Sequence, residues 1–161
     1  MHIFKFKQLS LILSIGIFVF LLDQITKILM IELLGSLTGR ISITPFFNLA
    51  LGFNRGVSFG LLNDLGSLGP TLLSILTVII ICFLIIWLLK TNVIWEKIAL
   101  SMIVGGAFGN LTDRIRNGAV TDFLDFYIGT YHWPTFNVAD IGICIGAVSL
   151  VVCSFRAENR S

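Results

Sequence analysis

The chain has 161 residues, of which 56% are hydrophobic and 12% are charged, and its formal net charge is +2. This apolar fraction exceeds the roughly 45–50% of soluble globular domains. Because the apolar residues also cluster in runs, the composition predicts an α-helical integral membrane protein with one membrane domain over residues 1–161. The small net charge and the scattered basic residues indicate no nucleic-acid partner.

Four apolar segments are predicted to cross the bilayer, which makes the expected fold a four-transmembrane-helix bundle. Their approximate bounds are 9–34, 70–89, 93–111 and 136–155. The second is free of charge, and at a rise of 1.5 Å per residue it can cross a hydrocarbon core of ~30 Å. The third contains a run of small residues, and Gly142 and Gly146 in the fourth form a GxxxG motif. Both features predict close packing between helices.

Two long connections separate these segments, at residues 35–69 and 112–135. The first is rich in glycine, serine, asparagine and aromatic residues, and it contains short β-like stretches between turn residues. It is too apolar to be disordered, and long loops of this kind are usually functional. We therefore expect a small β-cradle at the membrane surface.

The distribution of basic residues predicts the orientation in the membrane. Four spans put both termini on one side, where six basic residues lie against five on the other side. Three of those five, Lys27, Arg55 and Arg114, lie in polar motifs that suggest roles in a site. Discounting them predicts cytoplasmic termini and two extracytoplasmic loops.

The cysteines and histidines do not predict a metal site. Cys82, Cys144 and Cys153 all lie in apolar runs, where a small hydrophobic residue is their ordinary role. His2 and His132 are the two histidines, and neither belongs to a cluster with metal-ligand spacing.

Polar and ionisable side chains gather at one end of the predicted helices and in both loops. They are Asp23, Lys27, Asn54, Arg55, Asn110, Arg114, Asp122, Asn137 and Asp140. Each alone is explained by helix capping or by interfacial solvation. Together they predict a polar cavity, because ionisable groups in a membrane are costly and normally face a cavity or one another.

Two of the aspartates at this end of the molecule could form a catalytic pair. Two carboxylates within about 3 Å share one proton near neutral pH, and such a pair can activate water and polarise a carbonyl without a metal or a covalent intermediate. Asp140, at the start of the fourth apolar segment, is one candidate. Asp122 and Asp125 are three residues apart, so in a strand they face opposite sides and only one can face Asp140. The pattern alone does not choose between them.

Five motifs in order carry a resemblance to a known family. They are DQITK (23–27), NRGVSFG (54–60), GGAFGNLTDR (105–114), VTDFLDF (120–126) and FNVAD (136–140). The whole chain resembles the lipoprotein signal peptidases, or signal peptidase II, which are aspartic endopeptidases of the bacterial inner membrane. The resemblance implies that Asp122 and Asp140 are catalytic and that Asp125 is structural. It also implies roles in substrate binding or site support for Asp23, Lys27, Asn54, Arg55, Gly56, Asn110, Arg114 and Asn137.

The same resemblance implies the substrate and its location. The expected substrate is a prolipoprotein that carries diacylglycerol on its lipobox cysteine, and cleavage before that cysteine releases the signal peptide. The expected enzyme is a monomer without a cofactor, in contact with membrane lipid. Its active site is expected near the extracytoplasmic face of the inner membrane.

Two other functions remain as alternatives. GVSFG (56–60) fits the G-x-S-x-G pattern of a nucleophile elbow, so Ser58 with His132 as base would make an intramembrane serine protease. A small proton-coupled transporter would instead use the carboxylates as a relay. Clustering of the acidic groups at one end of the helices disfavours the transporter.

Overall fold

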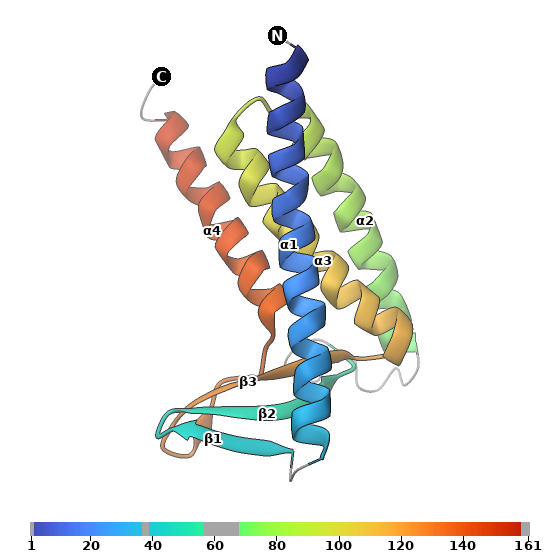
Figure 1. Cartoon of the computed structure of the whole chain (residues 1–161), viewed down its shortest axis with the longest axis vertical. Coiled ribbons are helices and arrows are strands. Elements are labelled where there is room, and N and C mark those ends of the chain that lie inside the picture. The colour runs from blue at the N-terminus through green and yellow to red at the C-terminus, as the bar shows by residue number, and fades with distance from the viewer. Residues whose placement is uncertain (1, 37–38, 57–67, 159–161) are drawn as a thin grey trace.

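A computed structural model describes residues 2–36, 39–56 and 68–158 of the chain. In these ranges four helices form a bundle and four strands form one small sheet (Figure 1). The helices are α1 (His2–Gly35), α2 (Leu68–Lys90), α3 (Ile94–Asn117) and α4 (Val138–Glu158). The strands are β1 (Arg40–Thr44), β2 (Phe47–Asn54), β3 (Val120–Ile128) and β4 (Tyr131–His132).

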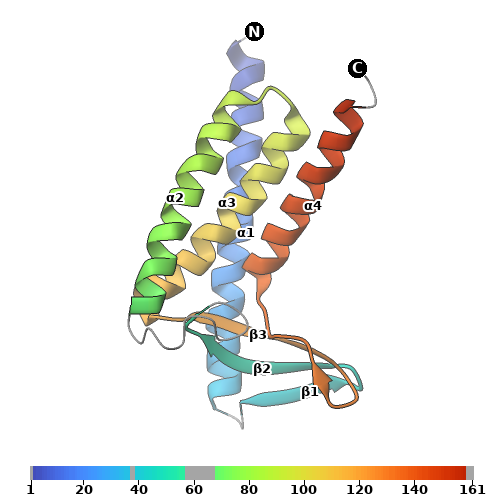
Figure 2. The same ribbon diagram turned by 180° about the vertical axis from the view of Figure 1, so that it is seen from behind.

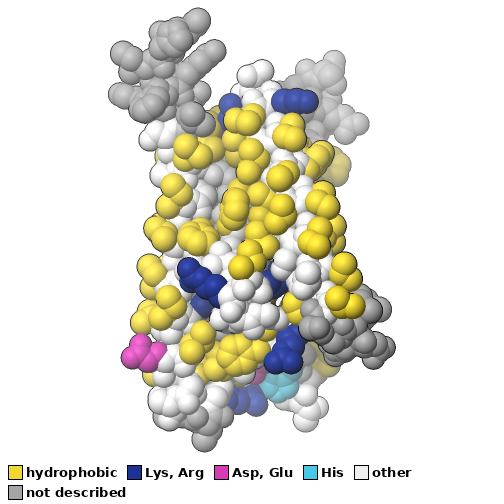
Figure 3. Space-filling view, turned by 90° about the vertical axis from the view of Figure 1, so that its right-hand side faces the viewer, with side chains coloured by type: hydrophobic (Ala, Val, Ile, Leu, Met, Phe, Trp, Pro, Cys, Tyr) yellow, Lys and Arg dark blue, Asp and Glu magenta, His cyan; other side chains and the backbone are white. Residues whose placement is uncertain are grey.

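The bundle and the sheet occupy opposite ends of the molecule. The start of α1 and the end of α4 lie together at one end, and the sheet crosses the other end (Figure 1). In the described ranges three segments are long and apolar enough to cross a membrane: Ser10–Gly35, Leu68–Lys90 and Val138–Arg156. Hydrophobic side chains cover the helical part of the face in Figure 3, and the acidic and histidine side chains seen there lie near the sheet. The protein is therefore a membrane protein with a polar end.

Helix α3 lies at the centre of the bundle and packs against α1, α2 and α4 (Figure 2). Its small residues allow this close approach, since a Cβ added at Gly105 would collide with the backbone of Gly16 in α1. The Ser101 hydroxyl also donates a hydrogen bond to the Ile12 carbonyl. The sequence motif in α4 acts in the same way, because Gly146 lies against the Ala99 carbonyl of α3.

The third predicted span differs from the helix that the structure contains. Helix α3 continues past residue 111 to Asn117 and ends where Gly118, at φ 67°, donates its N–H to the Arg114 carbonyl. A left-handed glycine is a common helix stop, and the apolar run alone did not show it. Because of this extension Asp113 and Arg114 lie within the last turns of α3.

The sheet is antiparallel, with strand order β1-β2-β3-β4. In the pairing of β2 with β3, Leu49 lies opposite Leu124 and Gly52 lies opposite Asp122, so β2 carries an irregularity between these pairs. Such a bulge bends a strand and redirects its side chains. Phe136 then adds a single bridge to Leu124, which holds the chain before α4 against β3. This bridge brings the start of α4 beside Asp122.

Candidate active site

A cavity of about 540 Å³ lies between the end of the helical bundle and the sheet. Asp122 from β3 and Asp140 from the first turn of α4 both line it. Its other lining residues are Asn54, Gly56, Leu73, Asn110, Arg114, Val120, Tyr131, Trp133, Pro134, Thr135, Phe136 and Cys144. The structure therefore brings most of the predicted polar residues to one concave surface.

The start of α4 is fixed by a reciprocal pair of hydrogen bonds. Asn137, just before the helix, accepts from the Asp140 backbone N–H at 3.0 Å, and its own N–H donates to the Asp140 carboxylate at 3.2 Å. This arrangement is a capping box, with an acidic residue at the third helical position. Asp140 therefore has a structural role as well as a place in the cavity.

Asp122 is buried, with 2% of its surface exposed, and two amides donate to it. The Asn137 side chain lies 2.7 Å from one carboxylate oxygen, and the Asn54 side chain lies 3.3 Å from the other. Burial, followed by the charge of Asp140, raises the pKa of Asp122 from 3.8 to about 6. The amides favour the ionised form, but they do not offset the loss of solvent. Asp122 thus responds to Asp140 electrostatically, as expected for two neighbouring carboxylates.

Asn110 of α3 connects the cavity to the interior of the bundle. Its side-chain nitrogen donates to Asp140 at 2.8 Å. Its oxygen accepts from Lys27 at 3.0 Å and from Asn137 at 3.1 Å. With a carboxylate on one side and a cation on the other, the orientation of the Asn110 amide is determined by its partners.

Lys27 lies in a buried cluster behind Asn110. Its ammonium group is 2.9 Å from Asp23, one helical turn away, and 3.1 Å from Asp113 of α3. Asp23 accepts from the Ala139 N–H of α4 at 2.9 Å, and Asp113 accepts from the Thr121 N–H of β3 at 2.9 Å. The cluster therefore fixes the backbone beside Asp140 and beside Asp122 at once.

Two members of this cluster were missed in the sequence. Gln24 donates to Asp23 at 3.1 Å and to Asp113 at 3.3 Å. Asp113 was assigned no role, although it lies inside the motif GGAFGNLTDR. Its spacing of three residues from Asn110, which puts both on one face of a helix, was the available signal.

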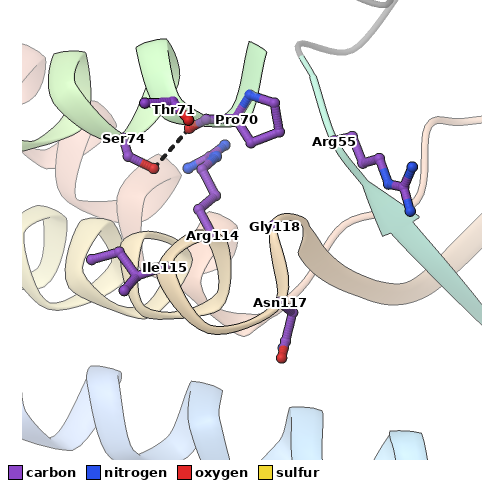
Figure 4. Close-up of a pocket in the computed structure, with 8 residues that line it drawn as sticks. All are labelled: Arg55, Pro70, Thr71, Ser74, Arg114, Ile115, Asn117 and Gly118. Carbon is purple, nitrogen blue, oxygen red and sulfur yellow. Dashed lines mark hydrogen bonds between the residues drawn. The ribbon is translucent and has the colours of Figure 1, made fainter. Parts of the chain in front are cut away.

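The two predicted arginines lie in different surroundings. Arg114 lines the cavity described above and also a neighbouring one of about 580 Å³, where it points from α3 toward Pro70, Thr71 and Ser74 at the start of α2 (Figure 4). Arg55, just after β2, is exposed and lines this second cavity, but it is not among the residues that line the first. The Nε of Arg114 is buried and has no hydrogen-bond partner in the described part of the chain.

The third acidic residue of the loop has other partners. Asp125 is not among the residues that line the cavity, and it accepts from Asn48 at 2.8 Å and lies 2.7 Å from His132. His132 is thus engaged on the sheet. Ser58, the nucleophile of the alternative serine mechanism, lies outside the described residues. No group of three or more metal-binding side chains occurs in the ranges that the structure describes.

The fold and the cavity define a polytopic membrane protein whose polar end holds two neighbouring aspartates. A family model described as signal peptidase (SPase) II matches residues 15–156. The lipoprotein signal peptidase of Aeromonas hydrophila is 43% identical over 150 residues, which cover 92% of this chain and 90% of that protein. The lipoprotein signal peptidase of Ralstonia nicotianae is 45% identical over 151 residues, covering 92% and 86%.

A solved structure is similar as well. A bacterial membrane enzyme determined by the in meso method at 2.3 Å resolution superposes with a TM-score of 0.81 and is 29% identical, over 94% of this chain and 92% of that one. The chain therefore belongs to the signal peptidase II family.

Proposed function

We propose that this protein is an aspartic endopeptidase that uses Asp122 and Asp140 to remove signal peptides from diacylglyceryl-modified prolipoproteins. Cleavage of prolipoproteins is the activity of its family, and neither the transporter nor the serine protease is favoured. The observation that carries the catalytic assignment is the meeting of these two carboxylates in one cavity, where both are hydrogen-bonded to Asn137.

The pair supplies acid–base chemistry with one shared proton. The protonated carboxyl donates a hydrogen bond to the carbonyl of the scissile peptide, while the ionised carboxylate takes a proton from the attacking water. The tetrahedral intermediate collapses when the amine leaves with a proton from the pair. The raised pKa of Asp122, at about 6, supports this role, since it keeps a proton on the pair at a higher pH than an ordinary aspartate would.

The surrounding residues hold the pair and the substrate. The Asn110 and Asn137 amides orient the two carboxylates through their hydrogen bonds. The Arg114 guanidinium, which lines the cavity, suits a carbonyl of the substrate backbone. Asn54 orients Asp122, and its side-chain oxygen accepts from the Gly56 N–H at 3.2 Å, which links the end of β2 to the site. Arg55, farther away, would meet the substrate outside the cavity.

The orientation of the enzyme is part of the same proposal. Helix α3, which has Glu96 and Lys97 near its start, crosses the membrane as the fourth span, surrounded by the other three. Both termini face the cytoplasm, and the sheet and the cavity lie at the extracytoplasmic side of the inner membrane. The signal helix of the substrate then lies beside the bundle, and its acyl chains stay in lipid. The protein acts as a monomer without a metal.

Incubation of the purified protein with a synthetic diacylglyceryl-modified prolipoprotein tests the proposal. We expect one cut, before the lipidated cysteine, that is detected by mass spectrometry. An identical peptide without the lipid serves as control and should remain intact. Cleavage of both peptides at equal rates would contradict the proposed substrate class, and cleavage by either Asp122→Asn or Asp140→Asn would contradict the proposed pair.

A further inference from the structure

One buried carboxylate outside the catalytic cavity joins all four strands of the sheet. Asp125 of β3 is only 3% exposed. Its oxygens lie 3.4 Å from the Arg40 guanidinium of β1, 2.8 Å from the Asn48 amide of β2 and 2.7 Å from Nδ1 of His132 in β4. A carboxylate with this many donors is a structural centre and not a solvated surface group.

The charge of Asp125 determines the direction of these hydrogen bonds. Burial acts to raise the pKa of Asp125, but the hydrogen bonds from His132 and Asn48, with the charges of His132 and Arg40, outweigh it and hold the pKa below its usual value. Asp125 is therefore ionised at neutral pH and can only accept. It follows that Nδ1 of His132 carries a hydrogen and donates it to Asp125.

The element that His132 holds is short. Strand β4 has two residues, and its register pairs Tyr127 with His132 and Ile128 with Tyr131. The His132 ring stacks on the Tyr127 ring with centroids 4.9 Å apart. A two-residue edge strand has little stability of its own, so the bond to Asp125 adds to the backbone bond from the Trp133 N–H to the Phe126 carbonyl in fixing it.

Both residues that flank His132 line the cavity of the catalytic pair. Tyr131 and Trp133 are exposed by 70% and 61%, and they also line an apolar cavity of about 430 Å³ on the sheet, with Phe46, Phe126 and Ile128 among its walls. The hairpin of β3 and β4 therefore forms an aromatic wall that is common to both cavities. Its position depends on the bond between His132 and Asp125.

We propose that Asp125 and His132 are positioning residues that hold Tyr131 and Trp133 against the prolipoprotein segment entering the cavity. The inference deepens the proposed function and rests on substrate binding in that cavity. Neither residue touches the reacting atoms. Loss of the pair should therefore weaken substrate binding much more than it slows the chemical step.

Two substitutions of His132 separate the hydrogen bond from the ring. His132→Phe keeps an aromatic ring beside Tyr127 but removes Nδ1, whereas His132→Asn keeps a donor near the position of Nδ1. We expect KM for the diacylglyceryl-modified peptide to rise about tenfold in His132→Phe, with kcat within about twofold of wild type. His132→Asn should restore most of the affinity. Thr130→Ala, in the exposed turn of the same hairpin, is the matched control and should leave both constants unchanged.

The position of the wall can be measured without activity. In a protein with Trp87→Phe and Trp95→Phe, the fluorescence reports Trp133 alone. We expect a shifted emission maximum in His132→Phe and a wild-type maximum in His132→Asn. Unchanged KM and unchanged emission in His132→Phe would overturn the proposal, as would a loss confined to kcat. The comparison stands even if the assignment of Asp122 fails, because it needs only a measurable KM of the parent protein.

Discussion

The side-chain amide of Asn137 donates to Asp122 at 2.7 Å, while the backbone N–H of the same residue donates to Asp140. One residue thus binds both carboxylates of the cavity, and it is also the N-cap of the helix that carries Asp140. Positioning of Asp122 and capping of α4 therefore depend on the same side chain. This coupling explains why a site with two acidic groups can be held at the end of an apolar bundle.

Replacement of either member of the pair should abolish cleavage. Asp122→Asn and Asp140→Asn preserve the shape of each side chain, and the amide oxygen introduced by Asp140→Asn can still accept at the N-terminus of α4. In either variant the remaining carboxylate has no second carboxylate with which to share a proton. We therefore expect kcat/KM to fall by about three orders of magnitude or more. Turnover of the lipidated peptide is the measurement, with circular dichroism as the check on folding. Asp125→Asn provides the comparison, since it should retain kcat.

The activity should decline as pH rises past the pKa of the pair. Asp122 has a pKa raised to about 6, so above this pH the free enzyme loses the proton that the mechanism needs. We expect kcat/KM to fall on the alkaline side with an apparent pKa near 6, which belongs to the pair as a whole. Bound substrate excludes further water and so raises the pKa of the pair. The alkaline decrease of kcat should therefore occur at a higher pH than that of kcat/KM. A kcat/KM that stays level from about pH 5 to about pH 9 would contradict this assignment.

The raised pKa also predicts a change in stability. The folded protein binds the Asp122 proton more tightly than the unfolded chain does. The contribution of Asp122 to the free energy of unfolding is therefore favourable at low pH and is lost as pH rises from about 4 through about 6. Asp122→Asn removes this desolvated charge. We therefore expect the variant to gain about 1 kcal/mol in free energy of unfolding relative to wild type at about pH 8 and no gain at about pH 4. Thermal unfolding in detergent at both pH values measures the difference.

Capping and positioning by Asn137 can be separated experimentally. Asn137→Ser keeps an oxygen that can cap α4, but it removes the amide that donates to Asp122. We expect near wild-type thermal stability with an approximately hundredfold loss of kcat, because the pair is no longer held. Asn137→Ala removes both functions, and should also lose about 1 kcal/mol of stability. Equal activity of the serine variant and the wild type would show that the amide is not needed.

The helices and the polar cavity followed from the sequence, but the details of the site did not. Apolar runs locate helices well, because a membrane demands both length and low polarity. Strand periodicity showed that Asp122 and Asp125 cannot face one cavity, but the side that each faces depends on the bridge between Leu124 and Phe136. That bridge is a tertiary contact with no local signal. Asp113 was missed for a similar reason, since the expected span ended at residue 111 and α3 runs on to Asn117.

The cluster around Lys27 should be the most sensitive point of the fold. Lys27→Met leaves Asp23 and Asp113 buried without their cation, and removing one partner of a buried charge network costs roughly 3–5 kcal/mol. We expect a large fall in melting temperature in detergent. Adding Asp23→Asn and Asp113→Asn to the same protein removes the uncompensated charge and should recover part of the loss. Lys90→Met, at the exposed end of α2, is the matched control and should melt like the wild type. If Lys27→Met also melted like the wild type, the two backbone N–H groups at Thr121 and Ala139 would have to be held by something other than this charge network.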